Sequence, residues 1–413
     1  MHDQPAPDTA ARSRRRWPAV LALGTAAAAL TLSLLLATTP GLRMIAVVTA
    51  ALSGGALEAE VSGGSLLDAP QFARITLRVD QDRYTLEKLQ ITWSPRALTQ
   101  GRLQLQKISA ARLLIQAAAT TSPPQPPQSL APPLDIEIET IECAQLQIDA
   151  QPQADLKDVR GSLRSTPGRW QATLMALAPF GPVRVEAGVE QASPFATVAE
   201  MQAHGEFDGR EWRADATVGG HLAGRLEVVV KARGMGLSGR AEAALEAFAS
   251  MPLRAARLQL DRFDPAALAA QLPHASITAQ LQLAPQSQAD QIGGRFELRN
   301  AEPGRLDAGL VPLAELRGNL ILGAGLARLS EARIAFAPGG SAVGSVELVA
   351  GRINAELELA GVDAAAWDRR LLPTRLAGSL KLEGGAASQQ LRLDLREPRF
   401  QVQAYAQRQG DHL

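Results

Sequence analysis

Hydrophobic and polar residues alternate with a period of two through most of the chain after about residue 55. A strand with one apolar and one polar face gives this alternation, because successive side chains point to opposite sides. It predicts strands at residues 72–79, 85–93, 103–115, 134–150, 158–163, 170–177, 183–189, 203–207, 212–218, 222–230 and 237–247. Turn residues such as Gly219 and Gly220 separate these segments at the spacing of a β-meander. Helical patterns of 10–15 residues are almost absent between them, so we expect a mainly β, mostly antiparallel sheet and not a doubly wound α/β fold.

Beyond residue 258, aliphatic residues keep one parity and charged or amide side chains keep the other. Successive antiparallel strands can align such positions into one continuous apolar surface. That surface needs a cover, which can be a second sheet, helices or a ligand. The residues predicted to line it are Leu258, Leu260, Ile277, Leu281, Leu283, Phe296, Leu298, Ile353, Leu357, Leu359, Leu376, Leu380, Leu382, Leu391 and Leu393.

A unit of strand, short helix and strand occurs twice, at residues 258–283 and 357–382, with an offset of 99 residues. Such a long period with several strands in each unit indicates a repeat architecture. Asp264 and Asp363 are expected to cap the two short helices, since aspartate accepts hydrogen bonds from free N–H groups at a helix start. Two turns are unstable alone, so each helix is expected to dock its apolar stripe at the rim of the sheet. We assign both aspartates this capping role and not a catalytic one.

The N-terminal part of the chain predicts a membrane anchor. Residues 17–40 contain no charged side chain and exceed the ~20 apolar residues that cross a bilayer as a helix. Arginines precede this span, so the positive-inside rule keeps the tail, residues 1–16, in the cytoplasm and exports the rest of the chain. The residues that set this orientation are Arg12, Arg14, Arg15, Arg16 and Trp17. A cleaved signal peptide is the alternative, but its apolar region is shorter, about 7–15 residues. In a Gram-negative cell the protein is then a single-pass inner-membrane protein with its bulk in the periplasm.

Composition narrows the classes of function. The chain has 42 basic and 42 acidic residues, so it lacks the basic excess of a nucleic-acid-binding protein. Hydrophobic residues make up 46% but aromatic residues only 4%, and this aliphatic character suits a smooth apolar surface better than a packed sandwich core. Cys143 is the single cysteine, and the five histidines lack metal-ligand spacing. We therefore expect no catalytic residues, no metal and no cofactor, and not an enzyme.

Five segments follow from these patterns. They are a cytoplasmic tail (1–16), a transmembrane anchor (17–40), an N-terminal β segment (41–116), a Pro-rich linker or loop (117–133) and a repeated β region (134–413). Six prolines fall within residues 117–133, and proline cannot donate to a strand ladder, so this segment is expected to be exposed.

The anchor, the repeated β units and the short Asp-capped helices together resemble the TamB family. TamB is the inner-membrane component of the translocation and assembly module and belongs with the AsmA-like, bridge-like lipid-transfer proteins. The resemblance rests on residues 57–95, on residues 300–320 and on the repeated unit. It implies an elongated sheet curled into a groove with an apolar concave face and short helices at the rim.

The resemblance also implies a function. Members of the family are linked to the movement of phospholipid toward the outer membrane and to outer-membrane biogenesis, and phospholipid acyl chains would be the ligand. They carry a C-terminal domain that meets an outer-membrane barrel partner, and this chain stops at Leu413, so it resembles an N-terminal or truncated form. The contact with a barrel partner is the part of the analogy that this departure puts in doubt.

Two other classes stay open at this stage. A scaffold or chaperone-like component for outer-membrane protein (autotransporter) assembly would offer a sheet edge or groove by strand addition, without conducting lipid. An anchored β-sandwich would pack its apolar faces against each other. An anchored hydrolase would need a nucleophile–base–acid set or a metal cluster, and the sequence shows neither.

Overall fold

The computed structural model describes residues 33–117, 125–149, 154–207, 209–234, 236–267, 272–288, 290–385, 388–398 and 400–409. The predicted cytoplasmic tail and most of the predicted anchor, with Arg12, Arg14, Arg15, Arg16 and Trp17, lie outside these residues. Among the helices of the described residues, none has both the length and the apolar character that a membrane crossing requires.

In the described part of the chain, 22 strands belong to one open, mostly antiparallel sheet, with a few short helices. This architecture confirms the prediction of a mainly β, mostly antiparallel fold. The predicted strands between residues 72 and 247 all correspond to observed strands, most of which extend one to several residues beyond the predicted limits, and the strand predicted at residues 222–230 lies four residues later in the chain. The predicted and observed strands correspond because a sheet with one face in contact with water requires apolar and polar residues to alternate along each strand.

The chain divides into two compact units. The first unit covers residues 1–119, 132–167 and 174–179, and the second covers residues 120–131, 168–173 and 180–413. The elements of the first unit are α2 (Thr39–Leu52), β1 (Leu57–Gly63), β2 (Gln71–Val79), β3 (Asp82–Ser94), η1 (Pro95–Gln100), β4 (Arg102–Gln116), β5 (Asp135–Asp149), β6 (Ala154–Thr166) and the second part of β7 (Arg169–Ala178).

A helix break separates residues 33–37 from α2 in the first unit. Thr38 lies between the two helical segments as the N-cap of α2, and its side chain accepts a hydrogen bond from the N–H of Gly41 at 3.3 Å. Pro40 follows in the first turn of α2, where its missing N–H costs no helical bond. The predicted anchor, residues 17–40, therefore ends close to a local change of helix direction.

The first unit departs from antiparallel pairing at one place. Strands β4 and β5 are parallel, with Arg102 opposite Asp135 and Gln116 opposite Asp149. Parallel neighbours need a crossover connection that returns to the starting end of the sheet. The Pro-rich segment predicted as a linker or loop is this connection. A small core of the first unit forms where Cys143 of β5 packs with Val159 of β6 and other aliphatic residues.

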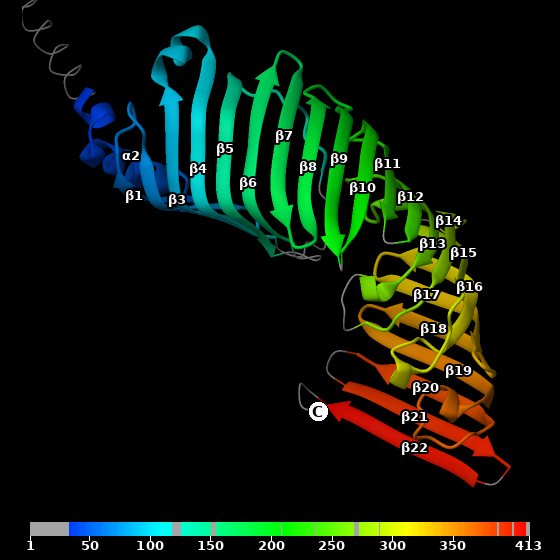
Figure 1. The fold of residues 1–413 in the computed structure, drawn as a ribbon. Helices are drawn as coiled ribbons and strands as arrows, with labels where there is room; N and C mark the ends of the chain where they lie inside the picture. The colour runs from blue at the N-terminus through cyan, green and yellow to red at the C-terminus, as the bar shows by residue number, and fades with distance from the viewer. Residues whose placement is uncertain are drawn as a thin grey trace, which may run out of the picture. The chain divides into compact units, whose positions relative to one another are not determined.

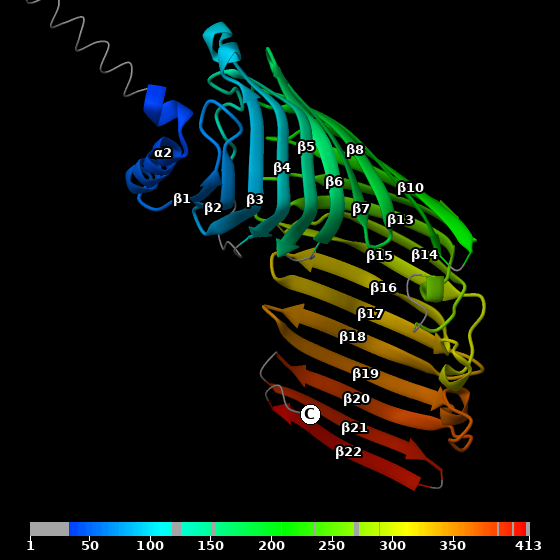
Figure 2. The ribbon, with the colours of Figure 1, turned by 60° about the vertical axis from the view of Figure 1, so that its left-hand side comes forward.

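The second unit continues as an antiparallel meander, and Figures 1 and 2 show its strands following one another in chain order. Its strands, besides the first part of β7, are β8 (Gly181–Glu190), β9 (Ala196–Phe207), β10 (Arg210–His221), β11 (Leu226–Gly234), β12 (Leu237–Leu245), β13 (Leu253–Phe263), β14 (Ile277–Pro285), β15 (Gln291–Asn300), β16 (Leu313–Gly323), β17 (Leu326–Phe336), β18 (Ser341–Val349), β19 (Arg352–Val362), β20 (Leu376–Gly384), β21 (Ser388–Glu397) and β22 (Phe400–Gln409). Its short helices are η2 (Pro265–Ala267), η3 (Leu306–Ala308) and η4 (Ala364–Ala366).

The repeated unit is present as β13–η2–β14 and β19–η4–β20. Both copies bulge just before the helix, between Leu260 and Phe263 in the first and between Leu359 and Val362 in the second. The helix of the second copy is shorter than the two turns predicted, because it closes after a single 3₁₀ turn at Ala364–Ala366. Backbone N–H groups of the loop, at Ala365 and Thr374, donate hydrogen bonds to the Asp363 side chain and turn the chain back toward β20 at that point.

Candidate functional site: the apolar face of the second unit

Three rows of directly paired residues cross the second unit from β8 to β22. Directly opposite residues of antiparallel strands point to the same face, so each row lies on one side of the sheet. The first row holds Val183, Ala203, Ala214, Ala232, Gly239, Leu260, Ala279, Leu298, Leu316, Ile334, Ala342, Leu359, Gly378, Leu395 and Val402. The second row holds Ala187, Ala199, Val218, Val228, Ala243, Ala256, Leu283, Gly294, Leu320, Leu329, Val346, Ala355, Leu382, Leu391 and Ala406.

The middle row lies between these two and is interrupted only by a bulge between β16 and β17. It holds Val185, Met201, Ala216, Val230, Ala241, Leu258, Leu281, Phe296, Gly318, Ala332, Gly344, Leu357, Leu380, Leu393 and Ala404. All 45 positions of the three rows are aliphatic, aromatic, Met or Gly. We call these rows together the apolar face.

Small and large residues alternate across neighbouring strands of the apolar face. Ala279 lies between Leu260 and Leu298, and Ala342 lies between Ile334 and Leu359. The alanines are buried beneath their larger neighbours, whereas the leucines stay half-buried. Part of each leucine side chain therefore remains available for contact with another apolar molecule.

Each strand of the second unit makes its extensive contacts with the strands next to it in the sheet. A small contact between β13 and β15 joins strands that are not adjacent. A β-sandwich would need a second sheet packed face to face across the apolar side. The described strands of this unit belong to one open sheet and do not form a sandwich with one another (Figure 2). Loops cover this side locally, as where Met251 from the β12–β13 loop packs with Leu283 and Ile292.

The opposite face of the sheet is polar and carries ion pairs. Arg328 and Lys381 lie directly opposite Glu347 and Glu356 on neighbouring strands and form ion pairs with them. The hydrogen bond from Arg213 holds the pKa of Asp215 below its ordinary value, and the hydrogen bond to Glu356 raises the pKa of Lys381. Asp215 and Lys381 therefore stay ionised near neutral pH, and this face is the water-facing side of the sheet.

All 15 residues predicted to line an apolar surface lie on the same side of the sheet as the apolar face. Twelve of them belong to the three rows, and Ile277, Ile353 and Leu376 have the same parity beyond the rows. Fourteen are half-buried, and Leu283 is 3% exposed because it lies in the Met251 cluster.

No residue of β8–β12, β16–β18 or β22 was among those predicted to line the apolar surface. Strands β8–β12 carry mainly Ala and Val, as at Val183, Val185 and Ala187, which give a weaker signal than Leu, and bulges interrupt the register between β16 and β17. Only the register shows that these positions align with the leucines farther along the chain.

Asp264 and Asp363 hold the two repeat loops in the same way. Each carboxylate accepts a hydrogen bond from the N–H two residues ahead, Ala266 or Ala365, at 3.1 Å. The same oxygen, Oδ1, accepts a second hydrogen bond eleven residues downstream, from Ala275 N–H at 3.1 Å in the first loop and from Thr374 N–H at 2.9 Å in the second.

The electrostatics of Asp264 reflect these contacts. Partial burial raises the pKa of its carboxyl group, but the hydrogen bonds from His274, Ala275 and Ala266 lower it further than burial raises it. The net shift is downward, so Asp264 is a carboxylate near neutral pH. The contact with His274 joins the end of the loop to its start, with Nδ1 of His274 2.9 Å from Oδ2 of Asp264.

Neither a metal centre nor a thiol site is apparent in what the structure describes. Among the described residues, no group of three or more His, Cys, Asp or Glu side chains is placed to hold a metal ion. The thiol of Cys143 is buried in the first unit and donates to the carbonyl oxygen of Gln145 at 3.1 Å.

Comparison with protein-family models, with curated proteins and with solved structures gave no match for this chain.

Proposed function

We propose that this chain is an inner-membrane-anchored periplasmic protein whose second unit carries phospholipid acyl chains along the apolar face toward the outer membrane. The observation that carries the proposal is the unbroken apolar composition of the three rows across β8–β22. Fifteen strands at ~4.8 Å spacing give roughly 70 Å of sheet, much more than one small-ligand site needs.

The energetics fit a lipid ligand. An acyl chain of 16 carbons that leaves a membrane for water loses about 0.8 kcal/mol per CH₂, or roughly 12 kcal/mol in all. Half-buried leucines can offset much of this loss while the headgroup stays in water. Because the rows repeat similar aliphatic side chains, no single position binds much more tightly than the next, which favours movement along the sheet. This role makes and breaks no covalent bond and uses no cofactor.

The resemblance to the TamB family supports two further parts of the proposal, the location in the inner membrane and the role in outer-membrane biogenesis. The predicted anchor at residues 17–40 would hold the chain in the inner membrane, and the segments 57–95 and 300–320 carry the likeness. A role in outer-membrane biogenesis and a barrel partner in the outer membrane belong to this proposal.

The test is a measurement of bound phospholipid. Full-length protein is purified in mild detergent and its lipids are quantified by mass spectrometry, with Leu281→Glu and Leu380→Glu compared to wild type. A carboxylate on the apolar face is costly beside an acyl chain, so we expect each variant to bind about tenfold less lipid, equivalent to ~1.4 kcal/mol.

Matched control variants place the same charge on the polar face. Gln282→Glu lies between Arg257 and Arg295, and Ala377→Glu lies opposite Arg396. Both control variants should bind as much phospholipid as wild type. Lipid bound by the predicted membrane anchor is the same in every variant, so it does not affect the comparison. Equal lipid in the leucine variants and the controls, or none in wild type, would falsify the proposal.

The edge strand supports a second candidate function, a scaffold for outer-membrane protein assembly. Among the described strands, β22 pairs with β21 alone, and Phe400, Val402 and Tyr405 on it are exposed. Such an edge can accept an added strand. Capture of an unfolded barrel protein by wild type and Leu281→Glu alike, with no bound phospholipid, would favour this candidate.

A further inference from the structure

The loop between β19 and β20 ends in an exposed segment that is both basic and aliphatic. Residues 368–375, which we call the β19–β20 tip, have the sequence DRRLLPTR, with three arginines against one aspartate. Leu371 and Leu372 are 50% and 80% exposed. These two adjacent leucines therefore leave much of their apolar surface open to solvent.

The base of the loop is held firmly while the tip projects. Asp363 accepts hydrogen bonds from the N–H groups of Ala365 and Thr374, and Thr374 Oγ1 accepts one from Ala364 N–H at 2.8 Å. The ring of Trp367 contacts Phe336 of β17 with 5.6 Å between centroids. The tip is therefore presented from a rigid base, which lowers the entropy lost when it binds.

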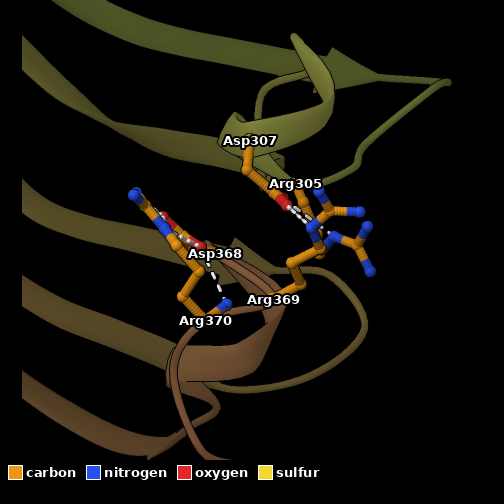
Figure 3. A network of polar contacts seen from close by, with 5 residues as sticks. All are labelled: Arg305, Asp307, Asp368, Arg369 and Arg370. Carbon is orange, nitrogen blue, oxygen red and sulfur yellow. Dashed lines mark hydrogen bonds and ion pairs between the residues drawn. The ribbon is translucent and has the colours of Figure 1, made fainter.

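A neighbouring loop, between β15 and β16, lies beside the tip (Figure 3). The N–H of Leu306 donates to the carbonyl oxygen of Trp367 at 2.9 Å. Asp307 forms ion pairs with Arg305 at 2.9 Å and with Arg369 of the tip at 3.5 Å. Leu306 itself is 51% exposed, so the second loop adds another exposed aliphatic side chain next to the start of the tip.

The positive charges of this region lie farther out than the negative ones. The side chains of Arg369 and Arg370 are 77% and 83% exposed, against 15% for Asp307 and 21% for Asp368. The hydrogen bond from the Arg370 side chain lowers the pKa of Asp368 to about 2, so the carboxylate stays ionised and keeps Arg370 in place. An approaching surface therefore meets guanidinium groups and leucines first.

We propose that the β19–β20 tip docks on an anionic lipid bilayer, with Arg369 and Arg370 contacting lipid phosphates and Leu371, Leu372 and Leu306 entering the boundary between headgroups and acyl chains. Basic and aliphatic side chains combined on one surface bind such membranes through apolar burial and charge attraction. Arg forms bidentate contacts with phosphate. The tip presents no exposed aromatic side chain of the kind that anchors protein interfaces. This surface is separate from the apolar face and does not depend on the proposed function.

The test is flotation of the full-length protein with vesicles. The protein is held in nanodiscs of zwitterionic lipid and mixed with vesicles of phosphatidylcholine containing 30% phosphatidylglycerol, or of phosphatidylcholine alone. We expect wild type to float with the anionic vesicles, and the floated fraction to fall about fivefold in Arg369→Gln/Arg370→Gln, in Leu371→Ser/Leu372→Ser and with vesicles of phosphatidylcholine alone. Flotation of nanodiscs without protein measures how much of the signal comes from fusion of nanodiscs with vesicles. Circular dichroism checks the strand content of each variant.

A matched control lies on the polar face of β18. Val343 and Val349 are 49% and 45% exposed there, so Val343→Ser/Val349→Ser removes a comparable pair of exposed apolar side chains. This variant should float like wild type. The proposal is overturned if wild type does not float with anionic vesicles, if either tip variant floats normally, or if the control loses flotation equally. Normal flotation of the tip variants would indicate that the tip binds a protein partner and not a bilayer.

Discussion

At the scale of single residues, two aspartates 99 positions apart perform the same structural task. Asp264 and Asp363 each join the start of a loop to its end, eleven residues later, through one carboxylate oxygen. The sequence pattern identified them as helix caps because aspartate accepts hydrogen bonds from free N–H groups. It did not reveal the second hydrogen bond, since a contact eleven residues away depends on how the loop closes.

Removal of either carboxylate should loosen its loop. We expect Asp363→Ala to lower the free energy of unfolding by about 1–2 kcal/mol, because two N–H groups lose their acceptor. Hydrogen exchange at Ala365 and Thr374 should speed up in the same variant. Asp261→Ala is the control, since its side chain is 58% exposed and makes only long contacts. An unchanged unfolding curve and exchange rate in Asp363→Ala would contradict this role.

The Asp264 loop should also respond to acid. Its folded pKa is lowered, so its stabilising contribution is present above the ordinary carboxyl pKa near ~3.9 and is lost as the pH falls through the lower folded value. Asp264→Asn should remove this part of the pH dependence of stability.

At the scale of elements, glycines in the three rows let neighbouring strands approach closely. A Cβ atom built on Gly344 would lie 1.9 Å from the carbonyl oxygen of Glu356, and one on Gly294 would lie 1.9 Å from that of Gln282. Both glycines lie opposite leucines, Leu357 and Leu283. The alternation alone predicted the strands but not these contacts, because the distance between two backbones depends on how the sheet twists and bulges.

Gly344→Ala should therefore destabilise the sheet. The added methyl group meets backbone and not a movable side chain, so we expect the free energy of unfolding to fall by about 1–3 kcal/mol. Gly219→Ala on β10 is the matched control, because a Cβ there has no atom within 4 Å. Chemical denaturation of the two variants checks the prediction, and equal stability would rule out a close-packing role for Gly344.

At the scale of the whole molecule, each compact unit is stabilised mainly between strands that are neighbours in the chain. Structures of this kind gain stability from nearest-neighbour terms and lose it progressively from an edge. The described residues of β22 are exposed along most of their length, whereas Ala279, Leu283 and Ile292 on β14 and β15 are buried. Within the second unit, stability is therefore expected to rise from the edge strand inward.

Native-state hydrogen exchange should show this gradient. Peptides from β22 and β21 should exchange fastest, those from β20 more slowly, and those from β14 and β15 slowest, because outer strands open without disturbing inner ones. Mass spectrometry of proteolytic peptides resolves these segments. Uniform protection from β14 to β22 would show instead that the second unit unfolds as one cooperative body.

The sequence alone determined the fold class, the approximate positions of the strands predicted between residues 72 and 247, and which residues of β13–β15 and β19–β21 point to the apolar side. These properties are local, since period-two alternation and turn residues act within a few positions. Tertiary structure decided the pairing register, which aligns Val185 on β8 with Leu281 and Leu393 far along the chain, and it placed Leu306 beside the tip of a loop about 65 residues away. Such alignments depend on bulges, turn lengths and long-range hydrogen bonds, and the pattern within one strand does not contain that information.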